Sequence, residues 1–129
     1  MERIIPDKVA EERQMILDGT YPSRIVQGRQ NKHIMGTYEF VQKQNAMQND
    51  SPGSKPSILT VDAQSLVDRY KGSGHINIPK GSLFPREIVN TDSVVGKTWV
   101  KSLQKYVDTR RIKIFYSSKG VHIVPVSDY

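Results

Sequence analysis

The feature that most constrains the fold is a pair of alternating runs near the C-terminus. Residues 111–116 read Arg-Ile-Lys-Ile-Phe-Tyr, and a second β-branched run covers residues 121–126 after a turn at Ser117–Gly120. This pattern predicts a β-hairpin. Side chains alternate between the faces of a strand, so the pattern separates two faces, Ile112, Ile114 and Tyr116 against Arg111, Lys113 and Phe115. We expect the basic face, with His122 or its neighbours, to bind phosphate while the apolar face packs on helices.

Helical patterns precede this hairpin. We expect helices over residues 7–18, 38–47 and 62–71, with Asp7, Thr37 and Asp62 as N-caps. In the second helix Tyr38, Val41 and Phe40 are the expected inward side chains. Residues 49–56 are rich in Asn, Ser, Pro and Gly, which predicts an exposed loop.

Short β-branched runs dominate the second half of the chain. They predict strands near residues 57–60, 75–78, 87–90 and 94–100. Residues 97–108 fit either a helix or strands with alternating lysines, and we favour strands joined by a turn. Helices followed by an antiparallel sheet indicate an α+β fold.

Composition narrows the class of protein. A length of 129 residues favours a single domain spanning 1–129, in which residues 1–22 form an N-terminal helical extension. No apolar run is long enough for a membrane span or a signal-peptide core, so we expect a cytoplasmic protein with no membrane partner. The absence of cysteine excludes disulfides, thiolate nucleophiles and cysteine-based zinc sites.

The charge is unevenly distributed. The net charge is +6, and residues 97–119 carry seven cationic side chains against one acid, Asp108. Such a basic segment suits RNA, DNA or an acidic protein. A solvated surface of a mildly basic protein is the alternative interpretation.

Two segments at opposite ends of the chain pair a histidine with cationic neighbours. They are residues 28–34, which contain Lys32 and His33, and residues 116–125, which contain Lys119 and His122. If the fold brings them together, two imidazoles and a lysine can move protons around a phosphodiester without a metal. If it does not, they are two basic strands.

Metal-free RNA cleavage assigns roles to particular side chains. His33 and His122 fit the general base and general acid, in an order that the residues leave open, because imidazole titrates near neutral pH. Lys32 and Ser117 complete the expected catalytic set. The expected phosphate and RNA contacts, which include Tyr116 (or Tyr38) stacking on a base, are Arg29, Lys113, Lys119, Thr60 and Tyr116. For each histidine, a purely structural role is the competing interpretation.

Several motifs together resemble one family. They include Gly28-Arg29-Gln30-Asn31-Lys32-His33-Ile34, Leu59-Thr60-Val61-Asp62, Tyr70-Lys71-Gly72-Ser73-Gly74 and the ending Tyr116-Ser117-Ser118-Lys119-Gly120-Val121-His122-Ile123-Val124-Pro125. Over residues 23–126 the chain resembles polymorphic toxin type 50, a domain also found at the C-terminus of phage minor head proteins.

The resemblance implies an RNase toxin of barnase-, EndoU- and RelE-like fold, with N-terminal helices packed on a twisted antiparallel sheet. The family's lysine–histidine pair falls on Lys32 and His33, and its terminal histidine falls on His122. The family usually has His at the position of Phe115 and Thr at that of Val121.

Three functions follow as hypotheses. The first is an endoribonuclease that needs no metal or other cofactor and cleaves RNA by attack of the 2′-hydroxyl. The second is a phage-encoded module on the same scaffold that binds RNA, a nucleotide signal or a protein without cutting. The third is a structural phage component. A free-standing toxin would also need a neutralising partner, which we expect to be an acidic immunity or antitoxin protein.

Overall fold

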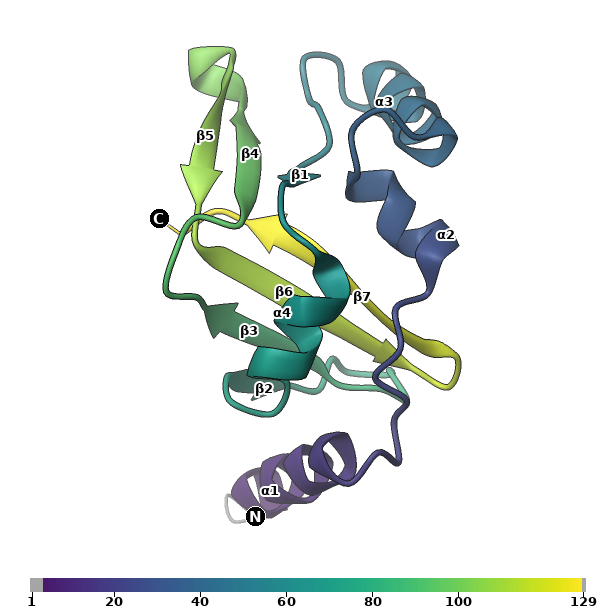
Figure 1. Cartoon of the computed structure of the whole chain (residues 1–129), viewed down its shortest axis with the longest axis vertical. Coiled ribbons are helices and arrows are strands. Elements are labelled where there is room, and N and C mark those ends of the chain that lie inside the picture. Colours follow the sequence, from purple (N-terminus) through teal and green to yellow (C-terminus); the bar gives the residue numbers. More distant parts are fainter. Residues whose placement is uncertain (1–3, 129) are drawn as a thin grey trace.

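The C-terminal hairpin forms one half of the larger of two antiparallel sheets, with β7 at its edge. In the computed structural model, which describes residues 4–128, β6 (Arg111–Ser117) pairs with β7 (Gly120–Val126). On its other side β6 pairs with β3 (Arg86–Asn90), which in turn pairs with β2 (His75–Asn77). The sheet order is therefore β2-β3-β6-β7 (Figure 1). The predicted hairpin and its turn are confirmed.

The smaller sheet has three strands, in the order β1-β4-β5. They are β1 (Ile58–Leu59), β4 (Gly96–Val100) and β5 (Lys105–Thr109), and a 3-10 turn, η2 (Lys101–Leu103), joins the last two. Strands joined by a turn are thus confirmed for residues 97–108. The strands form two sheets rather than one. The first sheet ends near Thr91, whose backbone N–H donates to the carbonyl oxygen of Arg110, and after Val95 the chain pairs with β1 and β5 instead.

The helices are α1 (Ile4–Leu17), α2 (Gln27–Gln30), η1 (Asn31–His33), α3 (Tyr38–Asp50) and α4 (Ala63–Tyr70). The predicted N-caps Thr37 and Asp62 are confirmed, whereas Asp7 is not an N-cap because α1 already begins at Ile4. Thr37 accepts a hydrogen bond from Phe40 N (3.1 Å) and Asp62 accepts one from Ser65 N (2.9 Å). The predicted α+β class holds.

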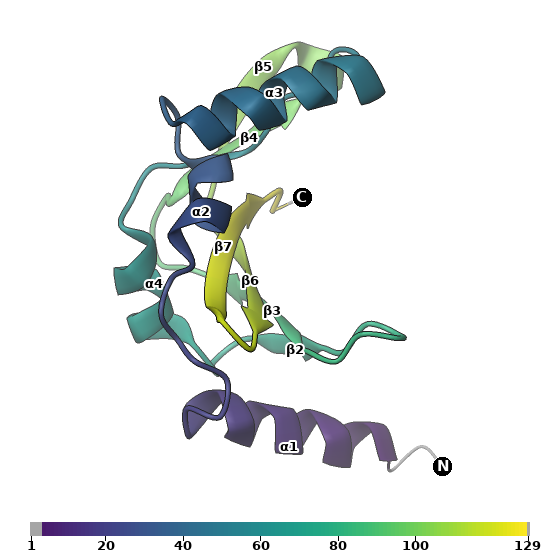
Figure 2. The ribbon, with the colours of Figure 1, turned by 90° about the vertical axis from the view of Figure 1, so that its right-hand side faces the viewer.

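The inward face expected for α3 is largely wrong. Phe40 is buried as expected, but Tyr38 is 71% and Val41 47% exposed, and the helix runs three residues past its predicted end to Asp50. Helix α3 lies at the same end of the molecule as the β4–β5 hairpin rather than over the larger sheet (Figures 1 and 2). A helix in that position buries only a narrow stripe of side chains.

The core lies between α4 and one face of the larger sheet. Val67 of α4 and Ile112, Ile114 and Ile123 of the sheet are almost fully buried. The opposite face carries half-buried side chains, among them Lys113, Phe115 and His122. Figure 2 shows α4 on the core side, while no helix of residues 4–128 covers the opposite face. The apolar and basic faces therefore follow the predicted alternation.

The outer edge of β7 is closed by the segment before α2. Val26 N donates to Val121 O (2.8 Å), and Val121 N donates to Arg24 O (2.9 Å). A Cβ at Gly120 would collide with the carbonyl oxygen of Arg24, so only glycine permits this approach. The segment leading to Lys32 and His33 is thereby held against the strand that carries His122.

No helix within residues 4–128 has the length and apolarity needed to cross a membrane.

Candidate functional site

The two histidines from opposite ends of the chain line one open pocket. His33 comes from η1 and His122 from β7. The pocket has a volume of about 510 Å³, and its other lining residues are Arg29, Lys32, Lys43, Phe115 and Val124. The fold therefore brings together the two segments whose proximity the sequence left open.

His33 is held by the residue before β1. Its Nδ1 lies 3.1 Å from the carbonyl oxygen of Ser57 and 3.0 Å from the Ser57 hydroxyl. The side chain is buried, with 7% of its surface exposed, whereas the neighbouring Lys32 is exposed. These contacts orient one ring nitrogen and leave Nε2 as the nitrogen available to a ligand.

His122 is part of a stack on the basic face of the sheet. It lies opposite Phe115 in the β6–β7 ladder, and the two rings are parallel, with centroids 4.7 Å apart and planes inclined by 5°. The guanidinium of Arg86 and the ammonium of Lys113 lie 4.9 and 5.3 Å from the centroid of the Phe115 ring. The aromatic pair is therefore bordered by cations.

Burial and positive charge lower the pKa of both histidines. Burial is the main cause for His33 and lowers its pKa to about 4, with further lowering from Lys43 and Lys32 and an opposing contribution from the Ser57 carbonyl. For His122, burial and then repulsion by His33, Arg29, Lys32 and Arg86 lower the pKa to about 4. Both imidazoles are thus neutral at pH 7 in the free protein.

The cations around the histidines are unpaired. Arg29, Lys32, Lys43, Arg86 and Lys113 form no salt bridge with any residue in the described part of the chain. No carboxylate among residues 4–128 lines the pocket. An anion entering it would therefore meet uncompensated positive charge, and its own charge would favour protonation of the imidazoles.

Sequence reasoning missed three residues of this site: Lys43, Ser57 and Arg86. Lys43 and Ser57 carry no local signal, because only the packing of η1 beside α3 and β1 makes them neighbours of His33. Arg86 had a partial signal, since it precedes a predicted strand and alternates with the buried Glu87. Its partner Phe115 becomes visible only through the β3–β6 register.

Two predicted site residues, Ser117 and Lys119, do not line the pocket. The Ser117 hydroxyl accepts a hydrogen bond from Arg29 Nη1 (3.3 Å) and donates one to Gly120 O (2.9 Å). Lys119 is exposed in the turn, where its backbone N–H bonds the Ser117 hydroxyl. Ser117 is therefore connected to the site through Arg29 and does not line the pocket itself.

Tyr116 is not a surface residue. Its side chain is 5% exposed on the core face, and its hydroxyl donates to Glu87 Oε1 at 2.7 Å. Burial and the Glu87 carboxylate raise its pKa above the ordinary tyrosine value. The expectation that Tyr116 stacks on a base is therefore wrong, since the strand alternation directs its ring inward.

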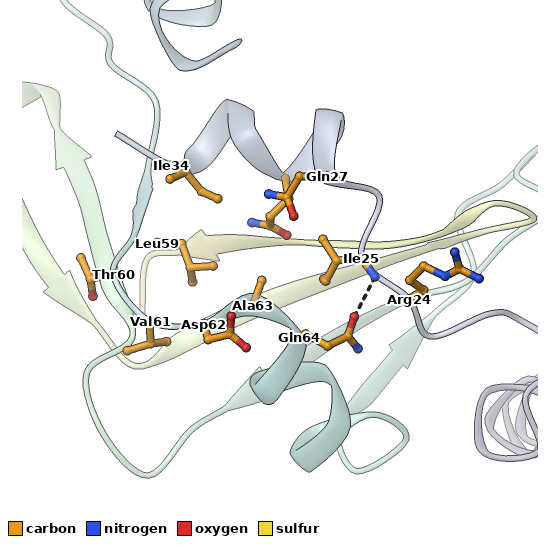
Figure 3. Close-up of a pocket in the computed structure, with 11 residues that line it drawn as sticks. Arg24, Ile25, Gln27, Ile34, Leu59, Thr60, Val61, Asp62, Ala63 and Gln64 are labelled. Atoms are coloured by element: carbon orange, nitrogen blue, oxygen red, sulfur yellow. Dashed lines mark hydrogen bonds between the residues drawn. The ribbon is translucent and has the colours of Figure 1, made fainter. Parts of the chain in front are cut away.

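Thr60 belongs to a different pocket. Figure 3 shows it with Leu59, Val61 and Asp62 on one side of a hollow of about 590 Å³, across from the segment that carries Arg24 and Gln27. A hydrogen bond from Ile25 N to Gln64 Oε1 (3.0 Å) ties the two sides together. The structure does not bring Thr60 together with the histidines.

A smaller pocket of about 180 Å³ adjoins the histidine pocket. Phe115, His122 and Arg29 line both, and the smaller one is completed by Ser82, Phe84, Pro85, Arg86 and Tyr116. The site is thus a hollow with two compartments that share the Phe115–His122 stack. Within residues 4–128, no group of three or more His, Asp or Glu side chains is arranged to hold a metal ion.

Comparison with known proteins gives one family. The model of a family described as bacterial toxin 50 matches residues 25–125, which include the residues of the histidine pocket and all but the last residue of the two sheets. No curated protein matches the sequence significantly.

Proposed function

Because the chain belongs to the bacterial toxin 50 family, we propose that this toxin domain is an endoribonuclease that uses His33 and His122 as its acid–base pair. The observation that carries the proposal is the convergence of the two histidines, from opposite ends of the chain, in a pocket that three cations and no carboxylate of the described residues line. An RNA phosphodiester is the anion that such a pair can both bind and cleave.

The proposed reaction is transesterification within RNA. One histidine removes the proton of the 2′-hydroxyl as its oxygen bonds to phosphorus, and the other donates a proton to the departing 5′-oxygen. The products are a 2′,3′-cyclic phosphate and a 5′-hydroxyl. Lys32, Lys43 and Arg29 stabilise the charge on the phosphorane oxygens, and Ser117 contributes by holding Arg29.

Substrate binding also adjusts protonation. Both imidazoles are neutral at pH 7 in the free protein because burial and neighbouring cations lower the pKa of each to about 4. A bound phosphate opposes those cations and raises both pKa values. One imidazole then takes up the proton that the leaving oxygen requires.

The test is RNA incubation with and without EDTA. Wild-type protein is expected to cleave RNA in both conditions and to leave cyclic-phosphate ends. His33→Ala and His122→Ala should each lower the rate by about 10²- to 10⁴-fold. His75→Ala is the matched control because His75 is exposed on β2 and does not line the pocket. Cleavage retained in both site variants would remove this mechanism.

One observation favours a second function, binding without cleavage. Phe115 occupies a position next to His122 and stacks on it, so a side chain that cannot transfer protons lies in the middle of the site. A binding module of this kind would hold RNA or a nucleotide with salt-dependent affinity and release it intact. Recovery of full-length RNA after long incubation with saturating protein would support this function over cleavage.

We also propose a protein partner for the same surface. A toxin that cleaves RNA inside its producer must be neutralised, and an acidic protein over the unpaired cations would block access to both histidines. Competition between such a protein and RNA for the wild type, weakened in Lys43→Ala, would be the expected result.

A further inference from the structure

We propose that His33 is the general base and His122 the general acid, with the Ser57 carbonyl as the group that sets this order. The inference rests on the proposed function and resolves a choice that two chemically identical side chains leave open. It also makes Ser57, which no motif singles out, the positioning residue of the site.

The first step concerns the tautomer of His33. A backbone carbonyl oxygen only accepts hydrogen bonds, so a nitrogen 3.1 Å from it is bonded only when it carries a proton. The Ser57 hydroxyl, 3.0 Å from the same nitrogen, can act as donor or acceptor and adapts to either state. Neutral His33 therefore has its proton on Nδ1 and a lone pair on Nε2.

The second step concerns what this tautomer can do. A general base needs an unprotonated nitrogen at a defined position within reach of the hydroxyl it activates. The bond from Nδ1 to Ser57 orients the ring and makes Nε2 the basic nitrogen. The 7% exposure of His33 maintains the neutral form, because burial disfavours the imidazolium.

His122 has the complementary properties. Neither of its ring nitrogens has a hydrogen-bond partner within residues 4–128, and its side chain is more exposed than that of His33. The charged and titratable groups that face it are His33, Arg29, Lys32, Lys43 and Arg86, so among residues 4–128 no anion faces it and a bound phosphate would supply the negative charge. Solvent can then supply the proton that His122 passes to the leaving oxygen.

The first test reads the tautomer without any reaction. In ¹⁵N-labelled protein at pH 7, two-bond ¹H–¹⁵N correlation spectra should show His33 with its proton on Nδ1, and His75 serves as an exposed reference in the same spectrum. Ser57→Ala removes the hydroxyl and keeps the carbonyl, so it should leave this pattern unchanged. A proton on Nε2 of His33, or a change of tautomer in Ser57→Ala, would overturn the proposal.

The second test separates base from acid. A ribonucleoside 3′-(4-nitrophenyl phosphate) has a leaving group that departs without protonation, so it needs the base and not the acid. His33→Ala should lower the rate by about 10²-fold or more on both this ester and RNA, whereas His122→Ala should do so on RNA and change the ester rate by less than about tenfold. The reverse pattern, or equal losses, would overturn the assignment.

The two levels of inference fail differently. If wild-type protein cleaves neither substrate, the proposed function is wrong and the acid and base roles fall with it. If it cleaves both while the variants do not separate, the function stands and only the order assigned to the histidines is wrong.

Discussion

Gln30 pairs with the backbone of Ile123 through both ends of its side-chain amide. Nε2 donates to the carbonyl oxygen of Ile123 at 2.9 Å, and Oε1 accepts from its N–H at 2.7 Å. The amide thereby replaces a neighbouring strand at the outer edge of β7. His122 precedes Ile123, and His33 follows Gln30 by one turn. The hydrogen bonds between Gln30 and Ile123 therefore fix the position of one histidine relative to the other.

Gln30→Ala should destabilise the protein. Gln30 is fully buried, so its loss leaves the N–H and C=O of Ile123 without partners, which we expect to cost about 2–4 kcal/mol of unfolding free energy. Urea denaturation checks this value. Gln27→Ala, on the exposed face of the same helix, is the control and should stay within about 0.5 kcal/mol of wild type. Equal stabilities for the two variants would contradict this account of the edge.

Tyr116→Phe should affect stability and not RNA binding. The variant loses the hydrogen bond to Glu87, whose carboxylate also accepts from Gly72 N (3.0 Å) and Gly74 N (2.6 Å). We expect a loss of about 1.5–3 kcal/mol, the range for hydrogen bonds to charged groups. Thermal unfolding and RNA affinity, measured side by side, check the prediction. Weakened RNA binding at unchanged stability would instead indicate that Tyr116 contacts RNA.

The C-terminal hairpin and helix α4 were predictable because their signals are local. Alternation in residues 111–116, the turn at Ser117–Gly120 and the cap at Asp62 each depend on neighbours in sequence. The same alternation predicted Tyr116 on the apolar face. The burial of Tyr116 agrees with that prediction and not with its proposed contact with RNA. The inward face predicted for α3 was wrong because the helix does not lie over the larger sheet, so Tyr38 and Val41 stay exposed.

The site was predictable only in part for a related reason. Lys32, His33 and His122 were identified from their segments, but the short helices α2 and η1 contain too few residues to show a period, so no helix was predicted there. Lys43, Ser57 and Arg86 enter the site through non-local packing and strand register. No pattern within a single segment reports such contacts.

Stability should fall as the pH drops from about 6.5 to 4. Burial and cations lower the pKa of His33 and His122 from 6.5 to about 4 in the folded protein, so the unfolded chain binds more protons across this window. Stability therefore rises with pH there, by up to about 1.4 kcal/mol per pH unit for each histidine.

Urea denaturation at several pH values checks this dependence. His33→Gln and His122→Gln should each flatten the slope, whereas His75→Gln, at an exposed position, should leave it unchanged. Addition of inorganic phosphate should also flatten it, since an anion in the pocket favours the protonated imidazoles. A slope that persists in the double site variant would assign the titration to other groups.

The salt dependence of RNA binding tests which cations form the interface. The sequence concentrates positive charge in residues 97–119, but of those side chains only Lys113 borders the Phe115–His122 stack, and Lys97 is paired with Asp108 at 2.8 Å. The cations that line the histidine pocket, Arg29, Lys32 and Lys43, come from the first half of the chain. We therefore expect Lys43→Ala to reduce the magnitude of the slope of log Kobs against log salt by about 0.7. Lys101→Ala, an equal change of charge in the turn between β4 and β5, should leave the slope unchanged. The opposite result would place RNA on the β4–β5 hairpin and separate binding from the two histidines.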